Sequence, residues 1–417
     1  MRATADVPLH AVRRPANATR CAASSRRTWS PVPSGRAPVR GPRTALLALL
    51  ALLGGLLGAC DDSPLARTPP PSWAHLTVPA TAAGADRLAV VLVSDWTSGG
   101  VSVIDLATRQ VAPLVTLAHA DALARSLPGR LLLVNRLGQD NLQLLDGDWS
   151  TRWQVSVGAG SNPQDALLLP DGERLLVSRY AGDPLLLSLT DGQRLGELDL
   201  SAWHDEDGAA ECGALARSGE RVLLAYQGLR HYEVVEGAGG VLEVDPATSS
   251  LRRHPTVAAN PYSPILPDPC APDGFLVGMA GRFGALDGGL ERLDATGQSR
   301  GLWYTEQELG GDLLGFAFAR DGRFGHALVA VAGADAGHQS TWLVALGDCT
   351  HKQIQPLLRP TDWSLTWLAT NDRDELYVAD RTVDRPGIRV LDGSTGAELT
   401  AAPLPTGLPP FQVLFVP

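Results

Sequence analysis

The sequence predicts an all-β protein, and three observations support this. Residues 161–201 contain four short apolar segments in about 40 residues, too short and too aperiodic for helices. Proline, glycine and aspartate mark the turns between them, as at Pro170-Asp171-Gly172 and Thr190-Asp191-Gly192. Similar units recur along the chain. Four antiparallel strands of this length form one blade of a β-propeller, and a blade needs sibling blades to cover its faces.

The recurring mark of each unit is an apolar third strand that ends in a turn, usually through aspartate. It occurs at Asp105, Asp146, Asp191, Asp245, Asp294, Asp348 and Asp392. The mean spacing of about 48 residues is typical of propeller blades. The sequence therefore predicts seven four-stranded blades. The count would be six or eight blades if one of the longer units near Asp245, Asp294 or Asp348 were divided differently.

The last strand is expected to pair with the first unit. That unit has a second strand (87–93), a third (101–105) and a fourth (111–117), but no innermost strand. Residues 408–417 repeat the innermost-strand pattern of residues 162–170. Because a closed ring leaves no open sheet edge, we predict that the C-terminal strand completes blade one.

The N-terminus is typical of a bacterial lipoprotein. Residues 45–57 form an apolar run of 13 residues after an arginine-rich lead, short of the roughly 20 that span a bilayer. The run ends at Leu57-Gly58-Ala59-Cys60, which resembles a lipobox, so Cys60 is the predicted lipidation site. The alternative is a secretory peptide that ends in a cysteine by chance. We expect a signal peptide at 1–59, a lipidated and proline-rich tether at 60–85, and the propeller at 86–417.

The charge distribution argues against nucleic-acid binding. The chain carries −10 overall and its first 44 residues carry +8, so the remainder carries −18. Nucleic-acid binding needs clustered positive charge.

We expect a monomeric propeller outside the cytoplasm, attached to a bacterial membrane by lipid, with an envelope protein or a small ligand as its partner.

The repeats resemble those of YVTN-repeat, YncE-like propellers, specifically lipobox-bearing members from GC-rich bacteria. The resemblance rests on Asn162-Pro163 with Pro170-Asp171-Gly172, and on residues 103–108, 133–141 and 198–211. It covers nearly all of residues 86–417 and implies a fold rather than an activity. Blades five and six depart from the pattern, because Asn260-Pro261 is present but the tyrosine–valine strand is not.

Several polar residues are candidates for a ligand site on one face. Arg136, Arg179 and Arg381 end second strands at the same relative place, and Asp140 and Asn141 follow the first of them. Guanidinium groups bind carboxylate or phosphate through paired donors, so these residues would form a rim for an anionic ligand. The alternative is structural, with the arginines tying neighbouring blades to acidic loops and turn carbonyls.

The loop at residues 204–211 is a candidate cation site. Asp205, Asp207 and Glu211 offer oxygen ligands around a glycine that permits a sharp turn, which a calcium ion would accept. The spacing is not that of an EF-hand, and a solvated acidic turn is the alternative. No other cofactor is expected.

Three cysteines remain in the mature chain besides Cys60: Cys212, Cys270 and Cys349. An oxidising compartment favours one disulfide, and three pairings are open. We favour Cys212–Cys270, because both lie at or near inner strands of adjacent blades.

The sequence contains no complete catalytic motif of the nucleophile-elbow, P-loop, Rossmann or paired-histidine kind. The first hypothesis is therefore a non-catalytic binding module in the cell envelope. The alternatives are a calcium-dependent lactonase-like hydrolase, a quinoprotein-like enzyme and a purely structural envelope protein. Oxygen ligands for such a hydrolase would come from Asp140, Asn141, Asp205, Asp207, Glu211 and Asp312. The fold alone does not separate these functions.

Overall fold

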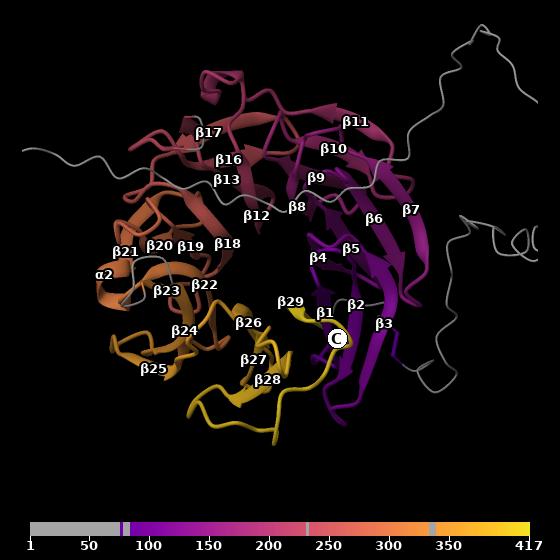
Figure 1. The fold of residues 1–417 in the computed structure, drawn as a ribbon. Coiled ribbons are helices and arrows are strands. Elements are labelled where there is room, and N and C mark those ends of the chain that lie inside the picture. The colour runs from indigo at the N-terminus through magenta and orange to yellow at the C-terminus, as the bar shows by residue number, and fades with distance from the viewer. Residues whose placement is uncertain (1–75, 78–83, 231–232, 333–338) are drawn as a thin grey trace, which may run out of the picture. The chain divides into compact units, whose positions relative to one another are not determined.

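A computed structural model describes residues 76–77, 84–230, 233–332 and 339–417. Seven antiparallel sheets form the blades of a ring, seen along its axis in Figure 1. Six sheets have four strands, and the seventh has three strands extended by two isolated bridges. The seven-bladed prediction is confirmed. The predicted signal peptide and Cys60 lie outside the described residues, among which no helix has the length and apolarity to cross a bilayer.

The strands follow in chain order from the innermost outward within each blade, except in blade one. Blade one contains β29 (Pro410–Val416), β1 (Leu88–Ser94), β2 (Gly99–Asp105) and β3 (Val111–Ala118). Blades two to four contain β4 (Ala122–Leu127), β5 (Arg130–Asn135), β6 (Asn141–Asp146) and β7 (Thr151–Ser156); β8 (Pro163–Leu168), β9 (Arg174–Arg179), β10 (Leu185–Ser188) and β11 (Arg194–Glu197); and β12 (Cys212–Ser218), β13 (Arg221–Tyr226), β16 (Gly240–Asp245) and β17 (Ser250–His254).

Blades five to seven continue this order. They contain β18 (Pro261–Pro267), β19 (Phe275–Met279), β20 (Gly289–Leu293) and β21 (Ser299–Thr305); β22 (Asp312–Phe318), β23 (Gly325–Ala332), β24 (Gln339–Leu346) and β25 (Ile354–Leu358); and β26 (Leu365–Thr370), β27 (Glu375–Asp380) and β28 (Gly387–Asp392). The additional elements are a small hairpin of β14 (Leu229–Arg230) and β15 (Glu233–Val234), the 3-10 turn η2 (Ser201–Trp203) and the short helix α2 (Glu306–Leu309).

The C-terminal strand closes the ring as predicted. β29 pairs antiparallel with β1, from Leu88↔Val416 to Val93↔Pro410, with one irregularity in register. In Figure 1 the yellow end of the chain lies beside the indigo β1. The Gln412 side chain also accepts the Ala124 N–H of blade two at 2.7 Å. The two ends of the propeller are therefore joined by a backbone ladder.

The core lies between blades, which explains the continuous apolar runs. Every residue of β1 is buried, because both faces of its sheet are covered. Leu88, Val90 and Leu92 pack in a cluster with blade two. The alternate side chains Ala89 and Val91 pack in a cluster with blade seven. Alternate side chains of β1 therefore face two neighbouring blades, whereas in a half-exposed sheet they would face the core and the solvent.

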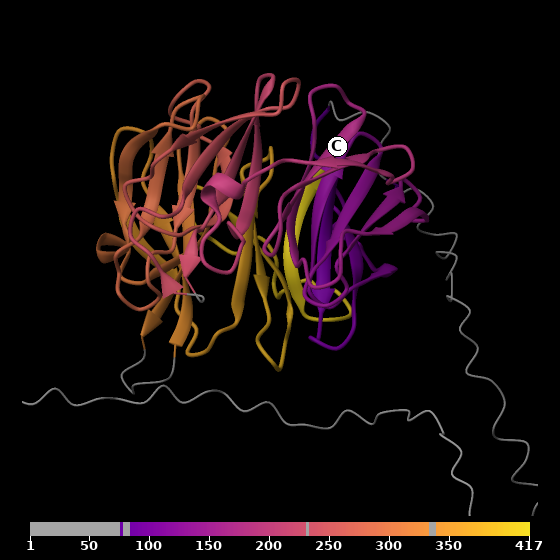
Figure 2. The ribbon, with the colours of Figure 1, turned by 90° about the horizontal axis from the view of Figure 1, so that it is seen from above.

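The two faces of the ring differ in the strand ends that they carry. We call the face on which the innermost strands begin the mouth face; Figure 2 shows the strands running between it and the opposite face. The repeated aspartates lie in turns of the opposite face and bond their own backbone, as Asp105 does with the N–H groups of Ala107 (2.9 Å) and Thr108 (2.7 Å). The N-terminal segment joins on this side, where the Trp149 indole donates to the Leu76 carbonyl at 2.6 Å.

Candidate functional site

A pocket of about 160 Å³, which we call the mouth pocket, lies at the mouth-face end of the central axis. Residues at the beginnings of innermost strands and at the ends of second strands line it. The residues with polar or aromatic groups at this pocket include Arg125, Arg136, Gln164, Asp165, Tyr180, Glu211, Gln227, Tyr262, Ser263 and Trp367. The convergence of several blades on one pocket makes it the first candidate site.

One backbone position recurs around this pocket. In six blades, the carbonyl of the residue before the inner strand accepts an N–H from the end of the second strand or just beyond it, at 2.8–3.1 Å. We call these six residues the mouth ring: Asp121, Asn162, Glu211, Asn260, Ser364 and Pro409. The sequence signal for the ring was Asn-Pro at residues 162–163 and 260–261.

Glu211 is the unusual member of the mouth ring. Its φ is +46°, as is that of Asn162, and Asn260 has +60°. Asparagine tolerates this left-handed conformation, whereas in most other residues it costs about 1 kcal/mol. The Glu211 carboxylate is also buried and accepts the Leu229 N–H at 2.9 Å. A strained, buried acid in a pocket is a functional candidate.

The surroundings of Glu211 raise its pKa to about 7. Burial is the main cause, because it disfavours the charged form, and the charges of Asp205 and Asp207 act in the same direction. The hydrogen bond from Leu229 opposes them. Glu211 can therefore exchange a proton near neutral pH.

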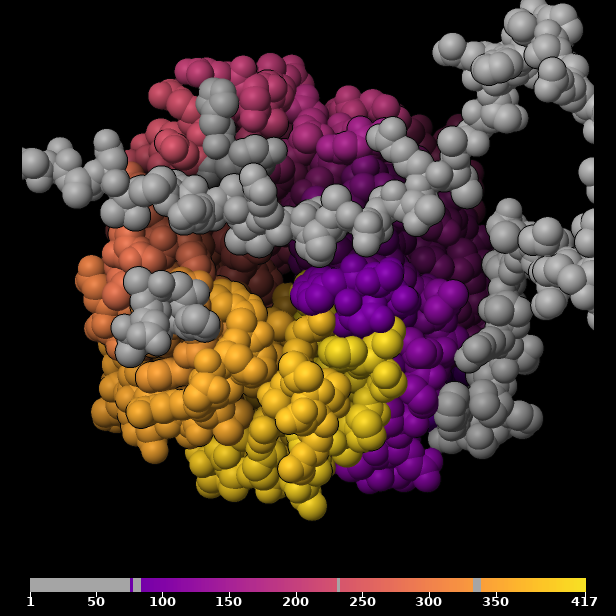
Figure 3. Space-filling view, in the orientation of Figure 1, coloured from indigo at the N-terminus to yellow at the C-terminus, as the bar shows by residue number. Residues whose placement is uncertain are grey.

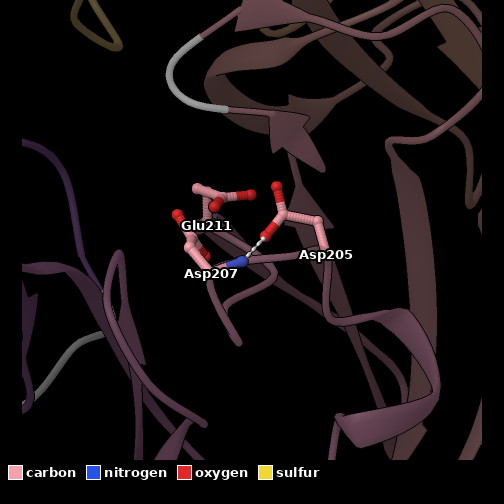
Figure 4. A group of neighbouring side chains, drawn as sticks. All are labelled: Asp205, Asp207 and Glu211. Atoms are coloured by element: carbon pink, nitrogen blue, oxygen red, sulfur yellow. Dashed lines mark hydrogen bonds between the residues drawn. The ribbon is translucent and has the colours of Figure 1, made fainter.

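The structure brings the three predicted cation ligands together. One carboxylate oxygen from each of Asp205, Asp207 and Glu211 lies within 4.8 Å of the others (Figure 4). Asp205 accepts the Asp207 N–H at 2.9 Å, and Asp207 accepts the Ala209 N–H at 3.0 Å. These bonds also describe an ordinary acidic turn, so calcium binding stays a prediction.

The arginines of the predicted rim bind carboxylates and carbonyl groups of the protein itself, and they do not converge on one ligand site. Arg136 lines the pocket and forms an ion pair with Asp121. Arg179 is buried and donates to the carbonyls of Val157 (3.0 Å) and Asp183 (2.7 Å). In blade seven, the Arg381 guanidinium donates to the carbonyls of Pro409 and Pro410, both at 3.2 Å. Its central carbon also lies 4.5 Å from the centroid of the Trp96 ring.

The two remaining rim residues hold local turns. The Asp140 carboxylate accepts the N–H groups of Gly160 (2.7 Å) and Asn162 (2.8 Å), which fixes the loop into blade three. Asn141 accepts the side-chain amides of Asn135 and Gln154, both at 2.9 Å. Of the five predicted rim residues, Arg136 alone lines the mouth pocket.

An ion pair that the sequence analysis missed links the inner strands of adjacent blades along the channel wall. The Arg125 guanidinium binds the Asp165 carboxylate through two donors, one of them at 2.6 Å, and also reaches the Leu215 carbonyl at 3.2 Å. Asp165 in turn accepts the Leu215 N–H at 2.8 Å. The pair joins β4, β8 and β12. In the sequence, the only indication of this pair was one arginine and one aspartate within otherwise apolar inner strands.

Burial alone would lower the pKa of Arg125, but the charge and hydrogen bonds of Asp165 outweigh it, so the net shift is upward. Arg125 therefore stays charged, and its charge is matched by Asp165 within the channel wall.

Large exposed hydrophobic side chains gather on the mouth face. Figure 3 is a space-filling view with this face towards the viewer, coloured by residue number. Ten such residues occur in the described part of the chain. Seven lie in mouth-face loops or at the start of an inner strand: Trp96, Leu137, Val257, Tyr262, Phe283, Trp363 and Val383. Phe283 and Trp363 contact each other, with ring centroids 6.1 Å apart. The turns of the opposite face, by contrast, are polar.

The favoured cysteine pairing was wrong. The structure pairs Cys270 with Cys349, whose Cα atoms are 5.3 Å apart, and leaves Cys212 as a buried thiol. Cys212 begins an inner strand at the mouth face, whereas Cys270 follows the end of the next inner strand at the opposite face. A seven-residue strand spans roughly 20 Å, and a disulfide needs Cα atoms within about 7 Å. Cys212 and Cys270 do lie in adjacent blades, as inferred, but at opposite ends of their inner strands.

No protein-family description matches this chain by sequence, and no curated protein is detectably related to it. Solved structures do resemble it. A Bacteroides fragilis protein assigned as a 6-phosphogluconolactonase has a TM-score of 0.52 at 12% identity, covering 80% of this chain and 98% of that one. The Pseudomonas aeruginosa periplasmic gluconolactonase PpgL has a TM-score of 0.50 at 15% identity, covering 79% and 99%.

A third similar structure is the dihydro-heme d1 dehydrogenase NirN, with a TM-score of 0.51 at 14% identity, covering 81% of this chain and 77% of that one. These proteins carry different activities in their names, and their identities to this chain are low. The similarity therefore establishes the β-propeller fold and leaves the activity to be argued from the site.

Proposed function

We propose that this protein is a lipid-anchored propeller of the bacterial cell envelope that binds a partner protein through its mouth face. The single observation that carries the proposal is the concentration of exposed aromatic and aliphatic side chains on that face. Large aromatic side chains dominate protein interfaces, and contiguous exposed apolar patches mark interaction sites. The half-buried Arg136 and Arg381 add to this surface, because arginine is also enriched at such interfaces.

The location outside the cytoplasm is supported by two features. The lipobox-like segment ends at Cys60, and the propeller contains the disulfide Cys270–Cys349. Disulfides form and persist in oxidising compartments. Membership among YVTN-repeat, YncE-like lipoproteins is part of the same proposal and rests on the repeat motifs. The locked roles of Arg179, Asp140 and Asn141 favour a non-catalytic module.

The test is capture of a partner from the organism's own membranes after chemical cross-linking. Phe283→Ser combined with Trp363→Ser should reduce the captured partner at least tenfold, because buried aromatic anchors each contribute about 2 kcal/mol or more. The matched control is Leu195→Ser combined with Leu399→Ser, which removes exposed leucines from outer parts of blades three and seven.

Equal capture by the wild type and the mouth-face variant would refute the proposed surface. Circular dichroism would verify that each variant is folded. Cys60→Ser should also release the propeller from membranes, and its retention would refute the lipid anchor.

A calcium-dependent hydrolase is the second candidate. It is favoured by the closeness of Asp205, Asp207 and Glu211, and by Glu211 lining the mouth pocket. Calorimetry with calcium distinguishes the candidates. Saturable binding lost in Asp207→Ala, together with turnover of a lactone abolished by Glu211→Gln, would replace the binding-module proposal.

A further inference from the structure

A second and larger cavity occupies the central channel beyond the mouth pocket. This chamber has a volume of about 620 Å³ and is lined by inner-strand residues of all seven blades. It shares six wall residues with the mouth pocket: Ala124, Arg125, Pro264, Leu314, Trp367 and Gln412. These residues mark the boundary between the two cavities. The chamber lies in the half of the channel that reaches the opposite face.

The wall of the chamber is mostly hydrocarbon. Its apolar lining includes Leu127, Leu168, Leu266, Phe318, Leu414 and Phe415. Small-molecule sites are typically cavities of about 300–1,000 Å³ with apolar walls and a few polar groups, and the chamber matches this description. An apolar ligand body would replace water along these walls.

The charged groups of the chamber are all positive among the described residues. Arg125 and Arg217 line it, and no carboxylate does. Asp165 neutralises Arg125 through two hydrogen bonds. Arg217 is engaged less tightly, because its Nε donates to the Gly219 carbonyl at 2.9 Å while its nearest carboxylate, Glu220, is 3.8 Å away. A guanidinium has five donors, so Arg217 retains the capacity to bind an anion.

The opening of the chamber lies beside Arg217. Ser126, Pro128 and Arg217 line the chamber and are exposed to solvent, and all three lie where inner strands end. The apolar wall therefore leads from a cationic entrance towards the centre of the ring. A ligand that fits has an apolar body and one anionic end.

From this arrangement we infer that the chamber binds a fatty carboxylate, with its chain among the inner strands and its carboxylate at Arg217. The site is separate from the proposed protein-binding surface, and neither depends on the other. Charge-assisted hydrogen bonds from arginine to carboxylate select for this head group over an alcohol or an amine.

Calorimetry with dodecanoate tests the inference on the lipid-anchored protein in mixed micelles. We expect one saturable site in the wild type. Arg217→Gln should weaken binding about tenfold, equivalent to about 1.4 kcal/mol, while Arg217→Lys retains part of the affinity. Arg130→Gln is the matched control, because Arg130 is on the same face and outside the chamber wall. Dodecanol and dodecylamine should bind at least tenfold more weakly than dodecanoate.

Ser126→Trp should block binding, because this exposed position can carry an indole over the entrance without disturbing the core. A second measurement compares the wild type with a Trp367→Phe variant. Brominated dodecanoate should quench the fluorescence of Trp367, and Trp367→Phe should remove that quenching. Absence of saturable binding, equal affinity for dodecanol, or binding unchanged by both Arg217→Gln and Ser126→Trp would overturn the inference.

Discussion

Two buried glutamates show how the same side chain acts differently at two points of this ring. Glu211 accepts one backbone N–H, from Leu229. Glu306, at the start of α2, is fully buried and accepts two, from Gly288 and Leu313, both at 2.8 Å. Burial raises the pKa of each to about 7. Their replacement by glutamine should therefore separate the effect of charge from that of hydrogen bonding.

Glu211→Gln should stabilise the protein at pH 8 by about 2 kcal/mol and have little effect at pH 5. The unfolded carboxyl ionises near pH 4.5, while the folded one stays neutral up to about pH 7, so the wild type loses stability across that interval. Glutamine does not titrate. Urea unfolding at the two pH values measures the difference, and a gain of equal size at both would contradict this explanation.

Glu306→Gln should instead destabilise the protein by about 1–3 kcal/mol at pH 5, whereas at pH 8 the loss of the buried charge should offset much of this cost. The amide nitrogen cannot accept a hydrogen bond, so it would leave one of the two buried N–H groups unpaired. The same urea titrations provide the comparison, with Glu173→Gln as an exposed control in a turn of blade three.

At the level of elements, the C-terminal strand is the part on which ring closure depends. β29 gives β1 its inner partner and, through Gln412, contacts blade two. Removal of residues 409–417 would expose the edge of β1 and one side of the apolar clusters that blade one forms with blades two and seven.

We expect this truncation to abolish the cooperative thermal transition and to increase proteolysis. Gln412→Ala is the milder comparison, and loss of its contacts to Ala124 should cost about 1–2 kcal/mol. A truncated protein that melts like the full chain would show that the closing strand is dispensable.

The strand pattern of this chain was predictable because it is local. Turn residues such as Pro170-Asp171-Gly172 and aspartates such as Asp105 act on their own backbone, so their spacing reports the blades directly. The Arg125–Asp165 pair and the Cys270–Cys349 disulfide join residues 40 and 79 positions apart, and nothing local specifies them. The cation ligands were predicted together because one short loop carries all three.

The whole molecule should be most stable near pH 5. Glu211 and Glu306 lose their contribution as pH rises from about 4.5 to 7. His326 acts in the opposite direction, because burial lowers its pKa to about 4, so stability is lost as pH falls from about 6.5 towards 4.

Two glutamates outweigh one histidine between pH 5 and 7, so stability should decline as pH rises through this range. Below pH 4 it should decline because hydrogen bonds lower the pKa of turn aspartates such as Asp191 and Asp392, and protonation removes that contribution. Melting temperatures across this range measure the profile. A maximum at pH 8 would contradict the assignment of these buried groups.

The contact between Leu76 and Trp149 determines how force reaches the ring. The contact lies on the opposite face of blade two. Under our proposal, the membrane tether therefore joins the propeller on the face opposite the partner-binding surface. A partner that pulls outward would load the Leu76–Trp149 junction before it strains β29. Under that proposal, the seam of the ring is shielded from mechanical tension that enters through the anchor.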